Sequence, residues 1–181
     1  METGPLEWFP MRVTYCREMK MKECLDTLGM ESFVPMHYEI VGEGANRSME
    51  LVPAIHNLIF VRAVREQLTD LKMTRSELAP LRYMMRPKEN GEGREVIAVP
   101  DRQMDNFLKV ARITDDRVMF LKYGNYLDKV GHRVCVTQGF FAGVEGVVKR
   151  IKNNRHVVVK IDGVAAVAIA NVPVAHIMPL D

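Results

Sequence analysis

The residues best suited to chemistry in this sequence are a cluster of glycines close to two phenylalanines. The stretch VTQGFFAGVEGVV, residues 136–148, places Gly139, Gly143 and Gly146 beside the pair FF and in front of a β-branched run. Glycine-rich loops that bind phosphate look similar, and so do tight turns between short strands. These alternatives imply different functions, and the surrounding elements decide between them.

A phosphate-binding loop needs a helix after its glycines, because backbone N–H groups at a helix N-terminus hold the anion. The residues after Gly146 read VVKRI, which indicates a strand, and the sequence contains neither G-K-[ST] nor G-x-G-x-x-G. We therefore predict that Gly139 and Gly143 form a turn. This turn would position Phe140 and Phe141, and Gly146 would permit a bend as the next strand starts. Which of the two phenylalanines is buried stays open.

Potential metal ligands are present, but they follow no known metal-binding motif. The cysteines, Cys16, Cys24 and Cys135, form no C-x-x-C pair, and the five histidines show no zinc-finger spacing. We expect reduced thiols, no metal and no cofactor. The carboxylates are best explained as solubilising charge, and no set of nucleophile, base and orienting group is apparent, so we expect no enzyme activity.

Composition indicates a folded protein with room for one ordinary domain or two small ones, since 48% of its 181 residues are hydrophobic and 27% are charged. The start, METGPLEWFP, lacks a signal-peptide pattern, and no run approaches the ~20 apolar residues that span a bilayer. We expect a cytoplasmic protein with no membrane contact. The net charge of +2 is too small to indicate nucleic-acid binding by itself.

The first 114 residues alternate between strand and helix patterns. Residues 8–15, WFPMRVTY, predict a strand, and REMKMKECLDTLG predicts a helix with Gly29 at its C-terminal cap. SFVPMHYEI and LVPAIHNLIFVRA flank a polar, glycine-containing tip and predict a long hairpin. Two further helices are predicted in REQLTDLKM and DRQMDNFLKVARI, and further strands in LRYMMRP and EVIAVP. We predict an α+β domain over 1–114 in which an antiparallel sheet packs with three helices.

The pattern changes in the last third of the chain. Residues 129–181 contain five short β runs, RVCVT, GVVKRI, HVVVKI, VAAVAIA and VAHIM, separated by glycine or polar turns. Because no helical period occurs there, we predict a small all-β barrel over 129–181. Residues 115–128 contain charges, a glycine and an asparagine, and are predicted to be a linker.

The glycine cluster belongs to a longer stretch, VGHRVCVTQGFFAGVEGVVKRIKNNRHVVVKI. This stretch resembles the KOW motif, which implies an SH3-like barrel. The positions that match the motif are Gly131, Gly139, Phe141, Gly143 and Gly146. Together with WFPMRVTYCREMKMKECLDTLGMESFVP and NLIFVR, nearly the whole chain resembles NusG-family transcription elongation factors. RVTYCRE and NLIFV are closer to the specialised paralogues of this family, the RfaH-like and UpxY-like antiterminators of polysaccharide operons.

The resemblance implies a factor that docks on the clamp helices of RNA polymerase and suppresses pausing and termination at specific operons. Leu58, Phe60 and Tyr83 match positions of an apolar docking patch, and Arg12 stands at a further position of that patch. An apolar groove with a few buried aromatic contacts suits a partner helix. The alternative that Phe60 and Tyr83 are core residues stays open.

The resemblance also implies contacts to nucleic acid and a second partner. Arg17 and Lys20 match a region that faces the non-template DNA strand, and Arg47 in the hairpin tip could approach upstream DNA, although all three also suit a solvated surface. The KOW domain would bind a ribosomal small-subunit protein or Rho. Asp162 stands where the general factor has an aromatic residue, a departure expected of a specialised paralogue. The alternative function is a KOW-type ribosome- or RNA-binding protein of the translation apparatus, and a monomer is expected.

Overall fold

The structure is a computed structural model that describes residues 4–121 and 131–180. The chain divides into two compact units, Met1–Asp101 and Arg102–Asp181. The predicted linker, residues 115–128, lies partly outside the described residues. The domain limits at 114 and 129 therefore stay predictions.

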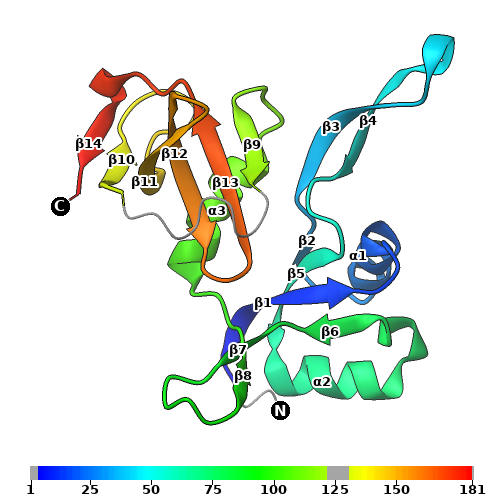
Figure 1. Cartoon of the computed structure of the whole chain (residues 1–181). Helices are drawn as coiled ribbons and strands as arrows, with labels where there is room; N and C mark the ends of the chain where they lie inside the picture. Colours follow the sequence, from blue (N-terminus) through cyan, green and yellow to red (C-terminus); the bar gives the residue numbers. More distant parts are fainter. Residues whose placement is uncertain (1–3, 122–130, 181) are drawn as a thin grey trace. The chain divides into compact units, whose positions relative to one another are not determined.

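The first unit is built on a four-stranded antiparallel sheet with the strand order β2-β5-β1-β6 (Figure 1). Its strands are β1 (Leu6–Val13), β2 (Ser32–Phe33), β5 (Leu58–Val64) and β6 (Leu81–Tyr83). The central pair, β1 and β5, is rich in aromatic and β-branched residues, which favour a pleated, buried surface. The first strand predicted from the sequence is confirmed, and it ends two residues earlier than expected.

Two helices, α1 (Glu18–Thr27) and α2 (Arg65–Thr74), pack on one face of this sheet. Both contribute apolar side chains to the core that lies between them and the sheet, namely Met21, Leu25 and Leu68. After α1, Gly29 adopts a left-handed φ of 69°, and the N–H of Met30 donates a 2.9 Å hydrogen bond to the carbonyl of Leu25. This is the geometry of the predicted glycine cap.

Two hairpins complete the first unit. The longer one pairs β3 (Met36–Val41) with β4 (Ser48–Pro53), carries the short 3₁₀ helix η1 (Gly44–Asn46) at its tip, and extends away from the four-stranded sheet in Figure 1. The shorter one pairs β7 (Met85–Pro87) with β8 (Arg94–Val96), and a second 3₁₀ helix, η2 (Ser76–Leu78), follows α2. The predicted long hairpin is confirmed.

The second unit contains a six-stranded antiparallel sheet with the order β14-β10-β11-β12-β13-β9. Its elements are α3 (Asp101–Ala111), β9 (Val118–Leu121), β10 (Arg133–Val136), β11 (Glu145–Ile151), β12 (Asn154–Ile161), β13 (Ala165–Ala170), the 3₁₀ helix η3 (Val174–His176) and β14 (Ile177–Pro179). Each of the five predicted β runs corresponds to one of the strands β10 to β14. The predicted fold class, an α+β part followed by an all-β part, is confirmed.

One strand of this sheet was not expected. The strand β9 lies inside the segment that the sequence predicts as a linker, and it pairs with β13 so that Leu121 faces Ala166 and Val118 faces Ile169. Its four residues, VMFL, are apolar enough to form a strand, but four residues are too few to show a period. The helix α3, predicted correctly from its apolar spacing, is grouped with this sheet in the second unit.

Candidate functional site

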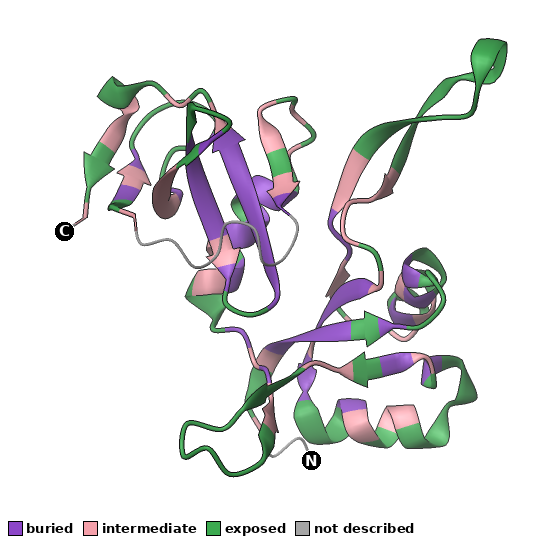
Figure 2. Cartoon of the chain, in the orientation of Figure 1, coloured by how far each residue is buried: buried purple, intermediate pink, exposed green. Residues whose placement is uncertain are grey.

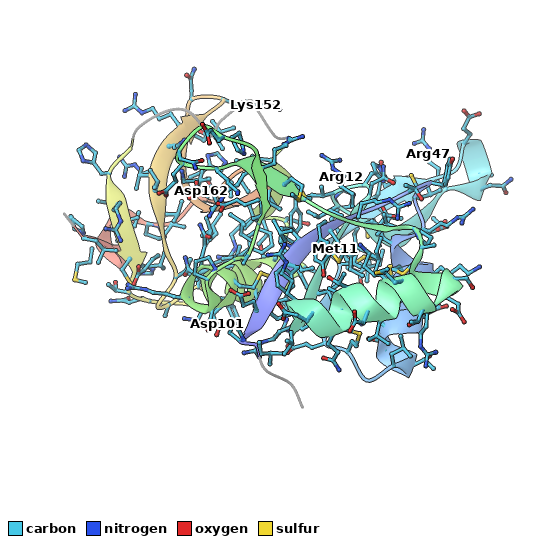
Figure 3. All side chains as sticks on the ribbon, turned by 90° about the horizontal axis from the view of Figure 1, so that it is seen from below. Met11, Arg12, Arg47, Asp101, Lys152 and Asp162 are labelled. Atoms are coloured by element: carbon cyan, nitrogen blue, oxygen red, sulfur yellow. The ribbon has the colours of Figure 1, made fainter. Side chains whose placement is uncertain are left out.

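The alternation of side chains along β1 and β5 sorts the predicted docking residues onto two faces of the first sheet. Phe9, Met11 and Val13 belong to the core beneath α1 and α2. Side chains along a strand alternate in direction, so the neighbouring Arg12 lies on the other face. Figure 3 labels Met11 and Arg12 on opposite sides of β1.

Three of the four predicted docking residues share the face that points away from α1 and α2. Arg12 is directly opposite Leu58 in the β1–β5 register, and Phe60 lies two residues further along β5. Arg12 is exposed, whereas Leu58 keeps only 4% and Phe60 0% of its surface accessible. Leu58 and Phe60 are therefore core residues in this structure, and a partner reaches them only if the residues that cover them move.

The fourth predicted docking residue, Tyr83, lies on the helix side of the sheet. It is opposite Met11 in the register, and its ring meets Phe9 edge to face with centroids 5.6 Å apart. Its hydroxyl is 3.1 Å from the hydroxyl of Thr69, and the ammonium of Lys72 lies 4.4 Å from the centre of its ring. The four predicted residues therefore do not form one continuous surface.

Burial of this aromatic corner changes the acid–base properties of its groups. Partial burial raises the pKa of the Tyr83 phenol, and it lowers the pKa of the Lys72 ammonium together with the nearby charge of Arg82. A raised pKa keeps the Tyr83 phenol neutral at neutral pH. Tyr83 is thus positioned to anchor α2 on the sheet through its hydroxyl and its ring.

The predicted nucleic-acid contacts are exposed, and one neighbour was missed. Arg17 precedes α1 and Lys20 lies in its first turn, both open to solvent. The guanidinium of Arg17 lies 5.4 Å from the ring centre of Tyr15, which is 82% exposed. An exposed aromatic ring beside a cation suits stacking on an unpaired base. The sequence signal for this aromatic neighbour was the spacing of Tyr15 and Arg17, two residues apart in a turn.

Arg47, the third predicted contact, follows η1 at the far end of the β3–β4 hairpin (Figure 3). It is exposed, as are the tip residues around it (Figure 2). At the tip of the hairpin, the Arg47 side chain can extend toward a phosphate group of a bound nucleic acid. A phosphate contact mainly requires such an accessible positive charge.

The β3–β4 hairpin also carries a surface that sequence reasoning missed. Tyr38 is paired with Leu51 and Ile40 with Met49 across the two strands, so these four side chains share one face. All four are exposed, with Ile40 at 63% and Met49 at 69%. We call these residues the hairpin apolar face. The alternating apolar positions in MHYEI and SMELVP were the signal, but they did not tell whether the face is covered.

In the second unit, the glycine-rich turn separates the two phenylalanines. Gly139 and Gly143 both adopt left-handed φ values, 83° and 79°, which confirms the predicted turn. Phe141 is buried at 5%, and Arg117 lies 5.3 Å from the centre of its ring. Phe140 is 86% exposed. Hence Phe141 serves the core, and Phe140 is available to a partner.

The remaining matched glycines act through close approach. A Cβ atom on Gly146 would lie 2.7 Å from the carbonyl oxygen of Val158 and 2.7 Å from Cγ1 of Val157, and one on Gly131 would lie 2.5 Å from the carbonyl oxygen of Val148. The expected role of Gly146 was a bend. The structure shows instead that it lets the neighbouring strand β12 come close.

Contacts at the start of β11 fasten α3 to the second sheet. Nη2 of Arg102 lies 2.7 and 2.9 Å from the two carboxylate oxygens of Glu145. The side-chain amide of Asn106 accepts a 2.8 Å hydrogen bond from the N–H of Glu145 and donates one to the carbonyl of the same residue. Asn106 thereby binds the backbone as a neighbouring strand would.

An ion pair stabilises the turn between α3 and β9. Nη2 of Arg117 lies 2.7 Å from Oδ2 of Asp115, and the backbone N–H of Arg117 donates to Oδ1 of the same carboxylate at 2.8 Å. These hydrogen bonds lower the pKa of Asp115 to about 2. The carboxylate therefore stays ionised at every pH at which the protein would work.

Residues able to ligate a metal gather at one place, the turn between β1 and α1. Ligand atoms of Cys16, Glu18 and His56 all lie within 4.8 Å of one another. The three cysteines of the chain are free, as expected. Across residues 4–121 and 131–180, no helix has both the length and the apolar character needed to cross a membrane.

Comparisons with known proteins identify the family. No curated protein matches the chain. A solved structure described as "Domain interaction in Thermotoga maritima NusG" matches with 18% identity and a TM-score of 0.47, covering 98% of each chain. The family model NusG, described as transcription termination factor nusG, matches residues 6–108, which is more than half of the chain. The chain therefore belongs to the NusG family of transcription termination and elongation factors, a family of transcription factors and not of enzymes.

Proposed function

We propose that this NusG-family chain binds RNA polymerase through its N-terminal part and suppresses pausing and termination. The hairpin apolar face carries the proposal. Four large apolar side chains exposed side by side on one ribbon are unusual in a soluble protein and mark a surface that binds another protein. NusG-family factors bind RNA polymerase, so we propose RNA polymerase as the partner of the hairpin apolar face.

Residues on the four-stranded sheet complete the proposed contact. Arg12 is exposed and can reach the polymerase directly. Leu58 and Phe60 are buried, so they would join the contact only when the residues that cover them move. Tyr83 supports the surface by holding α2 against the sheet through Thr69. The clamp helices of the largest polymerase subunit are the partner that the apolar character of this contact favours.

We also propose that Arg17, Lys20 and Tyr15 contact the exposed non-template DNA strand, and that Arg47 contacts upstream DNA. Arg17, just before α1, and Lys20, in its first turn, supply charge for phosphates, and the exposed ring of Tyr15 supplies a surface for base stacking. An unpaired strand is favoured over a duplex because a stacking platform is useful only where bases are accessible.

The second unit would act as a recruitment module. The exposed Phe140 on the glycine-rich turn is suited to bind a ribosomal small-subunit protein or Rho. Asp162 is exposed and pairs with Lys160 at 2.7 Å, which replaces an aromatic contact with a charged one and favours the ribosomal partner. We propose the functional limits 1–114 and 129–181 for the two domains, since the family match up to residue 108 includes most of α3.

We further propose a specialised paralogue that serves particular operons, of the RfaH-like or UpxY-like kind. The support is the resemblance of RVTYCRE and NLIFV to those antiterminators. The test is transcription in vitro over the leader of a polysaccharide operon with purified polymerase. Readthrough should rise with the protein on that leader and not on an unrelated template, and equal readthrough on both would contradict specialisation.

Polymerase binding is tested with purified core enzyme and immobilised protein. The double substitution Ile40→Ser with Met49→Ser removes the centre of the hairpin apolar face, and retention should fall on the order of tenfold or more, since loss of an apolar hot spot costs that much. Met73→Ser is the matched control, because Met73 is 82% exposed but lies on α2. Unchanged retention by the double variant, or retention of ribosomal subunits in place of polymerase, would refute the proposal.

A further inference from the structure

The turn after β1 and the residues before β5 bring together three side chains of the types that bind zinc. The ligand atoms of Cys16, Glu18 and His56 all lie within 4.8 Å of one another. Thiolate, carboxylate and imidazole are the ligands of protein zinc sites. Because His56 is far from the other two in the sequence, only the folded chain forms this cluster.

Glu18 is the first sign that the cluster suits a cation. The residue is 2% exposed, and its carboxylate accepts a hydrogen bond from the backbone N–H of Asn57. Among the residues that the structure describes, it forms no ion pair with lysine, arginine or histidine. Buried carboxylates in proteins are normally paired with a cation or bound to a metal. The N-terminus of α1 favours a negative charge as well, but it does not account for the thiol and the imidazole at the same place.

Asn57 is hydrogen-bonded to two of the three residues of the cluster. Its side-chain oxygen accepts a 3.0 Å hydrogen bond from the N–H of Cys16, and its carbonyl accepts one of 3.0 Å from the N–H of Val13. Asn57 thus fixes the backbone at Cys16 and donates its own N–H to the carboxylate of Glu18. A hydrogen bond behind a ligating group, as at Glu18, orients that group for a metal.

We propose that Cys16, Glu18 and His56 bind a zinc ion whose fourth position is open to water. Ligand atoms around tetrahedral zinc lie about 3.3–3.8 Å apart, given zinc–ligand distances of about 2.0–2.3 Å. Cys16 and His56 are exposed, so rotation of their side chains can close the cluster from its present spacing. The ion would join the start of α1 to the entry of β5.

The test uses the full-length, reduced protein and cobalt(II) as a spectroscopic probe for zinc. We expect one equivalent of Co²⁺ to produce a thiolate charge-transfer band and tetrahedral visible bands, and Zn²⁺ to displace it. Cys16→Ser should abolish the thiolate band, and His56→Gln should weaken binding tenfold or more. The controls Cys135→Ser and His176→Gln, which lie in the second unit, should leave binding unchanged.

Folding of the variants is checked independently, since both substituted residues are exposed and the metal-free melting temperature should stay unchanged. Zn²⁺ should raise the melting temperature of the wild type and not that of Cys16→Ser. The proposal is overturned by a lack of stoichiometric binding, by a Co²⁺ spectrum without a thiolate band, or by binding that Cys16→Ser and His56→Gln leave intact.

Discussion

At the scale of single residues, the side chains on the first sheet differ in what they offer a partner. Arg12 and Phe60 lie on the same face, but Arg12 is exposed and Phe60 is fully buried. Tyr83 lies on the opposite face, and its hydroxyl is hydrogen-bonded to the hydroxyl of Thr69. A substitution at Phe60 would therefore disturb the core before it disturbed a contact, and Arg12 is the better position for probing docking directly.

Gly146 carries a prediction at this scale. Replacing it with alanine places a Cβ atom 2.7 Å from the carbonyl oxygen of Val158, and a backbone atom can move away only by shifting the strand. Gly146→Ala should therefore destabilise the protein by about 1–3 kcal/mol, as overpacking does. Urea denaturation measures the change.

A conservative change nearby serves as the reference for that experiment. Thr137 is exposed at the end of β10, and Thr137→Ser should alter the free energy of unfolding by less than about 0.5 kcal/mol. If Gly146→Ala behaves like Thr137→Ser, the close approach of β11 and β12 is not what requires the glycine.

At the scale of elements, the β3–β4 hairpin and the helix α3 differ in how they are held. The β3–β4 hairpin is paired only with itself among the described strands, and its apolar face is exposed. The helix α3 is fastened to β11 by side-chain bonds to backbone groups, which is a more directional contact than apolar packing alone.

Asn106 carries the prediction for α3. Asn106→Ala removes both hydrogen bonds to Glu145. The backbone N–H and carbonyl of Glu145 then lack that partner. We expect a loss of about 1–3 kcal/mol in the free energy of unfolding and faster hydrogen exchange of the Glu145 amide. Asp105→Ala, an exposed change on the same helix, should leave both unchanged. Equal exchange rates in the two variants would show that the hydrogen bonds of Asn106 do not hold α3 on β11.

At the scale of the whole molecule, two compact units divide the proposed work. The first carries the hairpin apolar face and the cations Arg17 and Lys20 at the start of α1, and the second carries the exposed Phe140. Neither proposed activity requires covalent chemistry, since each surface is proposed to act by binding a partner. This agrees with membership of a family of transcription factors.

Phe140→Ala separates the two proposed activities. Because Phe140 is 86% exposed on a turn, its removal should leave folding and polymerase retention unchanged. Readthrough in a purified transcription assay should also be unchanged, whereas readthrough in a coupled transcription–translation system should fall. A loss of activity in the purified assay would mean that Phe140 contacts the polymerase or the DNA and not a ribosomal protein.

The sequence by itself determined most of the element types and their order, because hydrophobic period and turn residues are local properties of the chain. It thereby predicted the α1 cap at Gly29, the long hairpin, the five β runs and the turn at Gly139 and Gly143. It did not predict β9, because four apolar residues show no period.

Only the tertiary structure decided which surfaces are free and which distant residues meet. The register of β1 against β5 placed Leu58 and Phe60 on one face, where they are buried, and the register of β1 against β6 placed Tyr83 on the other face. The strand pairing in β3 and β4 gathered the hairpin apolar face, and the turn after β1 brought His56 to Cys16 and Glu18. The physical reason is that burial and proximity depend on pairings between segments far apart in the chain, which local patterns do not encode.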